Sequence, residues 1–216
     1  YNNSTGPRDP ELIRQQQVGY YACITHVDHQ IGRLLMALTE HKLMDNTVIL
    51  FTSDHGEMLS DHGLDRKSLP YEGSARIPML ICGAEKYVGR GGRVDQSLVE
   101  LRDVMPTCLE LAGAPIPAHL DGQSMLHGVD RTWLHGEHTF WVNDASSQFI
   151  VTAHDKFIWF TQRNEEQYFD LDKDPDETHN AIHDPAYQAR IAELRQLLAG
   201  ALKDSEEGYS DGEHLI

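Results

Sequence analysis

The sequence is poor in cysteine. Only three of its 216 residues are cysteine (Cys23, Cys82 and Cys108), and they lie far apart without a CxxC pair. A zinc-ribbon or thioredoxin-type site is therefore excluded. Sparse, unpaired cysteines are typical of buried free thiols, so we expect no disulfide framework.

Positive charge is also scarce. The chain has 18 Lys and Arg against 34 Asp and Glu, a formal net charge of −16 at pH 7. Nucleic-acid binding and polybasic membrane contact both need a basic face, so we expect neither nucleic acid nor membrane as a partner. An acidic chain still binds an anion where a metal ion or a single cation reverses the local field.

Several familiar patterns are missing as well. No apolar run approaches the roughly 18 residues that predict a transmembrane helix, and the first residues, YNNSTGPRDPEL, do not resemble a signal peptide. They also lack an initiator methionine, so we expect a piece of a longer protein. The GxSxG elbow, the Walker A loop, GxGxxG and HExxH do not occur, which argues against the enzyme classes that these motifs mark.

The first part of the chain has the pattern of an α/β domain. Residues 11–41 repeat apolar side chains at three- and four-residue steps, which predicts a long helix, and the β-branched run 47–52 predicts a strand buried on both faces. Residues 77–82 predict a second strand, and residues 98–112 a strand edge followed by a helix. This order favours a mainly parallel sheet flanked by helices.

The pattern changes at about residue 133. Short aromatic and β-branched runs separated by turn residues predict an antiparallel meander over residues 139–142, 148–152, 156–161 and 167–171. A helix with one apolar face is predicted from Pro185 onward. We therefore expect two domains, an α/β core over residues 1–132 and a small α+β subdomain with an antiparallel sheet over residues 133–216.

Residues that carry chemistry gather in the stretch FTSDHGEMLSDHGLDRK, residues 51–67. Asp54 and His55 follow the predicted 47–52 strand, and ligands of open α/β sheets lie outside the carboxyl ends of the strands. A carboxylate suits Mg²⁺, Ca²⁺ or Mn²⁺, and an imidazole favours Mn²⁺ or Zn²⁺. Turn formation explains an Asp-His-Gly loop equally well, because Asp and Gly both favour turns.

Two further residues of this stretch have alternative interpretations. Lys67, twelve residues after His55, is either an anion-binding ammonium beside a metal or a surface lysine. His62 is either a general acid or substrate contact, since histidine titrates near neutral pH, or an ordinary loop histidine. The HGEH group at residues 135–138 is placed on a strand or loop rather than on a metal-binding helix.

One long segment resembles the second signature region of the sulfatase family, in the alkaline phosphatase superfamily: TVILFTSDHGEMLSDHGLDRKSLPYEGSARIPMLI. Its order is specific, with an apolar strand, S-D-H-G, D-H-G-L, a lysine and Y-E-G-S-A-R-I-P before a second strand. Three further segments resemble the family's helices and C-terminal region: YYACITHVDHQIGRLLMAL, LVELRDVMPTCLELAGAPIP with LDGQSM, and QYFDLDKDPDETHNAIHDP. The resemblance covers nearly the whole chain.

The resemblance implies roles for single residues. Asp54 matches a metal-ligand aspartate, His55 the neighbouring position that also contacts the metal, and Lys67 the lysine that holds the substrate's sulfate. It implies an alkaline-phosphatase-like fold and one divalent ion, with Ca²⁺ expected first and Mg²⁺ or Mn²⁺ as alternatives. His62 stays a separate candidate for substrate binding, on its residue type alone.

The family's nucleophile is missing from this sequence. Sulfatases carry it in a C-x-P-x-R or S-x-P-x-R motif, whose Cys or Ser becomes formylglycine, and none of the three cysteines has this context. The resemblance therefore implies the C-terminal part of a sulfatase that hydrolyses sulfate esters of small molecules or glycans. Its nucleophile is expected in a missing N-terminal half.

Three consequences follow for the chain by itself. We expect it to be inactive and, with strand edges open, to form homo-oligomers. A phosphodiesterase or phosphonate monoester hydrolase of the same superfamily is the alternative function, because the segment does not separate the two chemistries. The bacterial cytoplasm or periplasm is the expected compartment.

Overall fold

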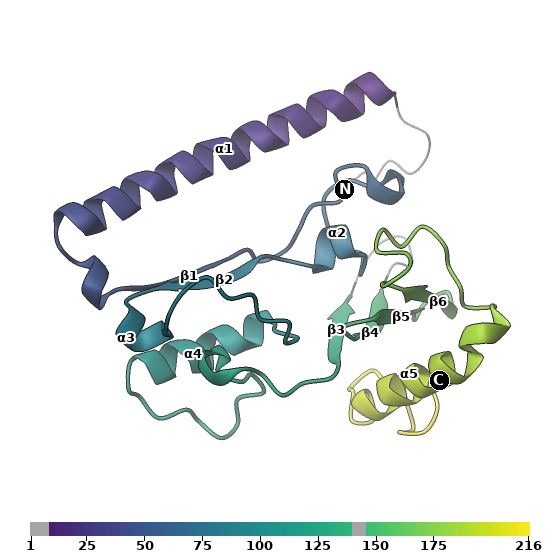
Figure 1. Ribbon diagram of the computed structural model, residues 1–216. Coiled ribbons are helices and arrows are strands. Elements are labelled where there is room, and N and C mark those ends of the chain that lie inside the picture. The colour runs from purple at the N-terminus through teal and green to yellow at the C-terminus, as the bar shows by residue number, and fades with distance from the viewer. Residues whose placement is uncertain (1–8, 140–145) are drawn as a thin grey trace. The chain divides into compact units, whose positions relative to one another are not determined.

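A computed structural model describes residues 9–139 and 146–216, which form two compact units. Unit 1 comprises Tyr1–Lys67, Arg76–Asp95 and Leu101–His127, and unit 2 comprises Ser68–Ala75, Gln96–Glu100 and Gly128–Ile216. The elements of unit 1 are α1 (Pro10–Glu40), β1 (Val48–Thr52), β2 (Met79–Gly83), α3 (Glu85–Val88) and α4 (Val104–Leu111), with 3₁₀ turns at Met44–Asn46, Asp61–Gly63, Leu101–Asp103 and Met125–His127 (Figure 1).

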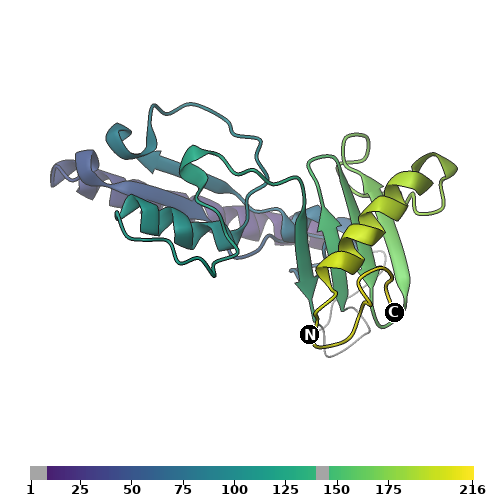
Figure 2. The same cartoon turned by 90° about the horizontal axis from the view of Figure 1, so that it is seen from below.

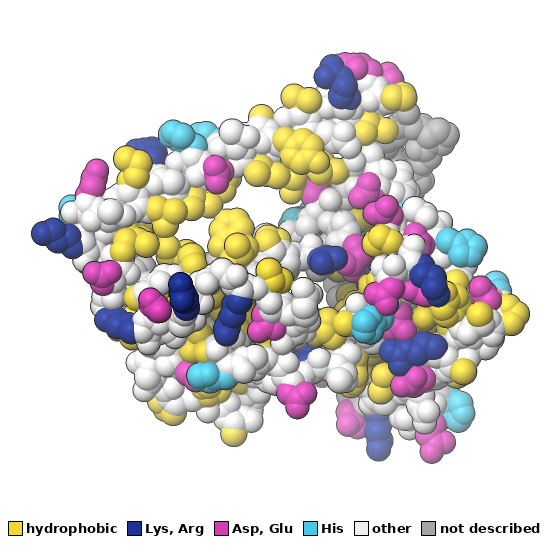
Figure 3. Space-filling model, in the orientation of Figure 1, with side chains coloured by type: hydrophobic (Ala, Val, Ile, Leu, Met, Phe, Trp, Pro, Cys, Tyr) yellow, Lys and Arg dark blue, Asp and Glu magenta, His cyan; other side chains and the backbone are white. Residues whose placement is uncertain are grey.

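The long helix expected over residues 11–41 is confirmed as α1. Asp9 caps it by accepting a hydrogen bond from the Glu11 N–H at 3.0 Å, and Pro10 occupies the first turn, where its missing N–H costs no hydrogen bond. No residue of α1 is buried by the described part of the chain, and Leu34 and Met36 are 57% and 62% exposed. Figure 3 shows hydrophobic side chains on the surface along α1. Despite its length, α1 is not apolar enough to cross a membrane, and neither is any other described helix.

The strands β1 and β2 pair antiparallel, with Leu50 opposite Ile81. The mainly parallel pairing expected from the sequence is therefore wrong for these two strands. Parallel neighbours need a crossover, usually a helix that packs on the sheet. The connection from residue 53 to residue 78 contains a 3₁₀ turn at Asp61–Gly63 and the four-residue helix α2 (Glu72–Ala75), and neither is long enough to serve as such a crossover.

The burial expected in unit 1 is also incomplete. Phe51 on β1 is 41% exposed and Leu80 on β2 is 53% exposed, because no described residue covers that side of the strands. All three cysteines are exposed free thiols rather than buried ones. Residues that the sequence pattern predicts to be buried, such as Phe51 and Leu80, are thus exposed to solvent in this chain.

Unit 2 has the antiparallel meander that the sequence predicts, in the order β3-β4-β5-β6. Its elements are β3 (Leu134–His138), β4 (Ser147–Val151), β5 (Asp155–Phe160), β6 (Glu165–Asp170), α2, a 3₁₀ turn at Pro185–Tyr187 and α5 (Gln188–Ala201). The strand expected at 139–142 lies, apart from Thr139, outside the described residues. The HGEH group forms β3 instead.

The core of unit 2 lies on both sides of β5. Phe157 and Trp159 pack with Ile191, Leu194 and Leu198 of α5, and Figure 2 shows this helix lying across one face of the sheet. The alternate residues of β5 are Ile158 and Phe160, and they pack with Phe169, Leu69 and Tyr71 on the other face. Every residue of β5 is buried, as period-two alternation between two covered faces requires.

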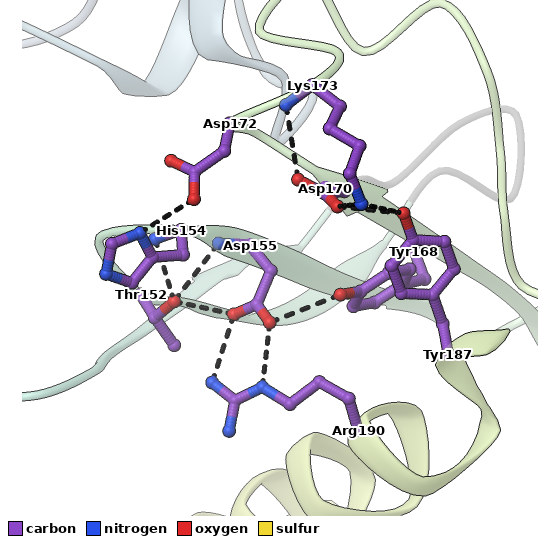
Figure 4. A network of polar contacts seen from close by, with 9 residues as sticks. All are labelled: Thr152, His154, Asp155, Tyr168, Asp170, Asp172, Lys173, Tyr187 and Arg190. Atoms are coloured by element: carbon purple, nitrogen blue, oxygen red, sulfur yellow. Dashed lines mark hydrogen bonds and ion pairs between the residues drawn. The ribbon is translucent and has the colours of Figure 1, made fainter.

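A buried carboxylate joins β5 to α5 (Figure 4). Asp155 accepts hydrogen bonds from Arg190 Nε at 2.7 Å and Nη2 at 3.1 Å, and from the hydroxyls of Thr152 and Tyr168 at 2.5 and 3.3 Å. Burial alone would raise the pKa of Asp155, but these hydrogen bonds, led by Arg190, outweigh it and hold the pKa below its ordinary value. Burial of the phenol raises the pKa of Tyr168, and the Asp155 carboxylate raises it further.

Candidate metal and anion site

Asp54 and His55 lie two and three residues beyond the end of β1, and their side chains turn to the same side. The Asp54 Oδ2 and the His55 Nε2 are 3.5 Å apart, and the Asp54 Oδ1 accepts the His55 backbone N–H at 3.1 Å. Neighbours within a strand point to opposite faces, so this convergence depends on the strand having ended at Thr52. The Asp54 carboxylate is 85% exposed and the His55 ring 37%.

The ring of His55 is oriented by its own loop. Its Nδ1 lies 2.7 Å from the Gly56 carbonyl oxygen, which can only accept, so Nδ1 carries the proton and donates. In the neutral ring, the Nε2 lone pair then lies on the side of Asp54. Metal-bound histidines typically donate their second N–H to a carbonyl or carboxylate in this way.

These two donors fit a divalent cation but do not complete its coordination. A carboxylate oxygen and an imidazole nitrogen are ligand types that Mn²⁺ and Zn²⁺ accept, and Ca²⁺ and Mg²⁺ favour the oxygen. Within residues 9–139 and 146–216, no three His, Cys, Asp or Glu side chains gather to hold an ion. A complete coordination shell would require further ligands besides these two.

The stretch from Gly56 to Arg66 folds back on itself as a tight loop. The Met58 N–H donates to the Arg66 carbonyl at 2.7 Å, and the Ser60 N–H donates to the Leu64 carbonyl at 2.8 Å. Met58 and Leu64 are 1% and 7% exposed and anchor the loop. The second Asp-His-Gly triplet is the 3₁₀ turn at its tip, and Lys67 follows directly after the returning limb.

Glu57 braces the two limbs of this loop. Its Oε1 accepts the backbone N–H of Leu59 at 3.3 Å and the backbone N–H of Arg66. Leu59, Ser60, His62 and Arg66 all have a positive φ, between 47° and 80°. Left-handed backbone at non-glycine residues costs about 1 kcal/mol or more each, and it clusters where function requires a fixed geometry. The loop is therefore held in one strained conformation by its hydrogen bonds.

The predicted site residues differ in their surroundings. Asp54 and His55 lie together, whereas His62 is exposed at the loop tip. The Lys67 side chain is exposed, and no described residue forms an ion pair with its ammonium. The roles assigned to these four residues stay predictions.

The HGEH group of β3 makes contacts within the sheet. His135 Nε2 lies 2.8 Å from the Gln148 Oε1, and the Gln148 amide donates to Glu137 at 3.4 Å. Burial lowers the pKa of His138, which favours its neutral form. The group therefore joins β3 to β4, and the strand assigned to it from the sequence is confirmed.

Sequence reasoning missed several charged residues that hold this region in place. Glu57 braces the loop, and Lys156 and Glu177 hold the segment after Lys67. Lys156 could have been recognised from the sequence, because it is the only charged residue in the otherwise apolar strand sequence KFIWF. Glu177 has no such local signal, because its burial depends on contacts remote in sequence.

Family models match most of the chain. One described as Sulfatase matches residues 1–114, and one described as N-sulphoglucosamine sulphohydrolase, C-terminal, matches residues 60–204. A curated arylsulfatase of Clostridium perfringens (strain 13 / Type A) is 46% identical over 213 residues, covering 95% of this chain and 44% of that protein. The chain thus spans less than half the length of this relative.

Solved structures are similar over the same extent. A structure in complex with its substrate D-glucosamine-2-N,6-O-disulfate matches with a TM-score of 0.73 and 28% identity over 87% of this chain and 40% of the other. The phosphonate monoester hydrolase of Agrobacterium radiobacter matches with the same TM-score and identity over 83% and 39%. These likenesses confirm the expected fold class, a partial alkaline-phosphatase-like α/β core with a small α+β subdomain.

Proposed function

Because the chain belongs to the sulfatase family, we propose that it supplies the metal- and sulfate-binding part of a sulfuric ester hydrolase. The observation that supports this most is the convergence of the Asp54 carboxylate and the His55 Nε2 lone pair after β1. The loop that follows returns to Lys67, the only residue of this stretch that brings an exposed ammonium. The nucleophile, a formylglycine, is assigned to protein outside this chain.

Each residue of the pair has a defined task in this proposal. Asp54 and the Nε2 of His55 hold one divalent ion, Ca²⁺ first, with Mg²⁺ or Mn²⁺ as alternatives. When bound, the ion acts as a Lewis acid on a sulfate oxygen. The Gly56 carbonyl keeps the proton of His55 on Nδ1, so that the ring stays a ligand.

Lys67 binds the transferring sulfate in this proposal. An ammonium next to the sulfate oxygens offsets negative charge that develops as the ester bond breaks, and such electrostatic stabilisation is usually the largest catalytic term. The exposure of Lys67 leaves its ammonium accessible to substrate. His62 at the loop tip is a further candidate for contact with the rest of the substrate.

The rest of the longer protein is the proposed partner of unit 1. Apolar side chains of α1 and β2 are exposed here, and the relatives matched are more than twice as long as the aligned region. We assign their cover, and the remaining metal ligands, to that additional chain. The chain by itself is accordingly proposed to be inactive and to self-associate through these surfaces.

A sulfated small molecule or glycan is the proposed substrate, supported by the similar structure that holds a disulfated glucosamine. The second candidate is a phosphonate monoester or phosphate diester, favoured by the match to a phosphonate monoester hydrolase. We expect the full-length protein to show a higher kcat/KM for 4-nitrophenyl sulfate than for a matched phosphonate or phosphate diester. Turnover of the phosphorus esters without turnover of the sulfate would replace the first proposal with the second.

A further inference from the structure

The segment Ser68–Ala75 follows Lys67 and belongs to unit 2, whereas Lys67 is the last residue of its stretch in unit 1. The segment covers the face of the sheet opposite α5. Its Tyr71 ring meets the Phe169 ring edge-on, with 6.1 Å between centroids, and the Tyr71 hydroxyl donates to the Gln167 Oε1 at 3.0 Å. Leu69 packs against the same cluster. The segment is thus part of the core of unit 2.

A fully buried lysine lies beneath this segment. Lys156 of β5 is 0% exposed, and its Nζ donates to the Pro70 carbonyl at 2.8 Å, to the Glu72 Oε1 at 2.7 Å and to the Glu177 Oε1 at 2.7 Å. The ammonium has three N–H donors, and each has an acceptor. Two of these acceptors belong to the segment.

Glu177 binds the segment a second time. It is 2% exposed, and its Oε2 accepts the Glu72 backbone N–H at 2.6 Å while its Oε1 accepts from Lys156. Burial raises the pKa of Glu177, and the Lys156 ammonium opposes this. Lys156, Glu177 and the partly buried Glu72 therefore form one hydrogen-bonded cluster, which we call the lysine clamp.

The lysine clamp is costly as a source of stability alone. Removing charges from water costs several kcal/mol per ion, and well-packed apolar residues often serve equally well or better. Unlike apolar contacts, charged hydrogen bonds are directional, so they hold donors and acceptors in one geometry. The clamp therefore specifies where Pro70 and Glu72 lie, beyond keeping the segment attached.

The clamp lies close to Lys67 along the chain. Pro70 is three residues after Lys67, and the intervening Ser68 N–H donates to the Ser74 Oγ at 3.1 Å, which closes the segment on itself. On the other side, the Arg66 N–H donates to Glu57. The backbone is thus held immediately before Lys67 and shortly after it.

We infer that Lys156 and Glu177 are positioning residues for Lys67, acting through Pro70 and Glu72. This inference rests on the proposed function, because it requires Lys67 to bind the transferring group. The small subdomain then fixes the backbone that directly follows Lys67, although its own sheet carries none of the proposed ligands.

The first test measures position without activity. Hydrogen exchange of the peptide 66–78 is followed in the full-length protein and in Lys156→Met, Glu177→Gln and Arg195→Met. Arg195→Met is the matched control, because Arg195 forms an ion pair with Glu166 in the same subdomain, at 2.7 Å from Nε to Oε1. We expect exchange about tenfold faster in Lys156→Met, a smaller increase in Glu177→Gln and none in the control.

The second test asks whether the effect passes through Lys67. Lys156→Met is expected to lower kcat/KM for an aryl sulfate about tenfold when Lys67 is present and to have little effect when Lys67 is already alanine. Equal losses in both backgrounds, or unchanged exchange of peptide 66–78, would overturn the positioning role. If Lys156→Met does not fold, Glu177→Gln is used in the same cycle with the same criteria. Absence of sulfate turnover in the unaltered protein would instead overturn the proposed function.

Discussion

In unit 2, Phe157, Leu194 and Leu198 are fully buried, whereas in unit 1 Leu34, Met36 and Leu80 are each more than half exposed. In both sets, apolar residues recur at the spacing typical of a helix or strand with one buried face. The difference is that the sheet of unit 2 is covered on both faces of β5 by segments of this chain. Leu34, Met36 and Leu80 of unit 1 have no such cover among the described residues.

This contrast bears on function because the proposed metal pair belongs to the open unit. In the proposed site Asp54 and His55 would supply two ligands, and no third acidic, histidine or cysteine side chain joins them among the described residues. The open core and the incomplete coordination occur together. We propose that the rest of the longer protein completes both, whereas the clamped subdomain buries both faces of β5 with segments of this chain.

The largest expected effect is on the core of unit 2. Leu194→Ala should lower the free energy of unfolding by about 3 kcal/mol, because Leu194 is 0% exposed and its loss leaves a cavity. Leu34→Ala on α1 is the matched control, with an expected change within about 0.5 kcal/mol. Urea unfolding is followed by tryptophan fluorescence, which reports unit 2, and by far-UV circular dichroism, which also reports α1. Equal losses of unfolding free energy in the two variants would contradict the contrast between the units.

The next effect is electrostatic and depends on pH. Asp155→Asn should cost about 2 kcal/mol near pH 7, because it weakens charged hydrogen bonds to Arg190. The folded-state pKa of Asp155 is lowered, so its contribution is present above the unfolded carboxyl pKa of about 3.9 and is lost as the pH falls through the folded value. Unfolding at several pH values should show the two proteins converge only below about pH 4. A gap that stays constant down to acid pH would contradict this assignment.

The next prediction concerns self-association through the exposed apolar surfaces of unit 1. Light scattering of the chain alone should give a mass above the 24.4 kDa of one copy. Introducing charge at two exposed apolar positions, Leu34→Glu with Leu80→Glu, should shift the mass toward one copy. If the unaltered chain is monomeric, these exposed apolar surfaces do not mediate self-association.

The smallest expected effect is metal binding by the chain alone. Two ligands should hold Mn²⁺ only weakly, with a Kd of about 1 mM. His55→Ala should abolish even this binding, and His62→Ala should leave it unchanged, as electron paramagnetic resonance of free Mn²⁺ measures. Tight stoichiometric binding, or equal loss in both variants, would contradict the choice of the first Asp-His pair.

Elements set by local pattern could be predicted from the sequence. The periodic run of α1, the β-branched run of β1 and the aromatic run of β5 all form where expected. The pairing direction of β1 with β2 could not be predicted, because it depends on how the connection between them folds. Burial in unit 1 failed for a related reason, since a residue such as Leu80 is buried only if another segment covers it.

In the site, too, local features could be predicted from the sequence and contacts between distant residues could not. The closeness of Asp54 and His55 could be anticipated from a strand that ends just before them. The brace at Glu57 and the clamp at Lys156 could not, because neither residue type nor spacing reveals which carboxylate a distant backbone N–H will meet.

The role of Lys67 is tested most directly by steady-state kinetics of the full-length protein with an aryl sulfate. Lys67→Ala should lower kcat/KM by a factor of about 100 or more, because a charge that stabilises the transferring group is lost while the fold is kept. Lys86→Ala, which removes another exposed ammonium from unit 1, should change it by no more than about twofold. Unchanged turnover in Lys67→Ala would contradict the account of this chain as the sulfate-binding part of a sulfatase.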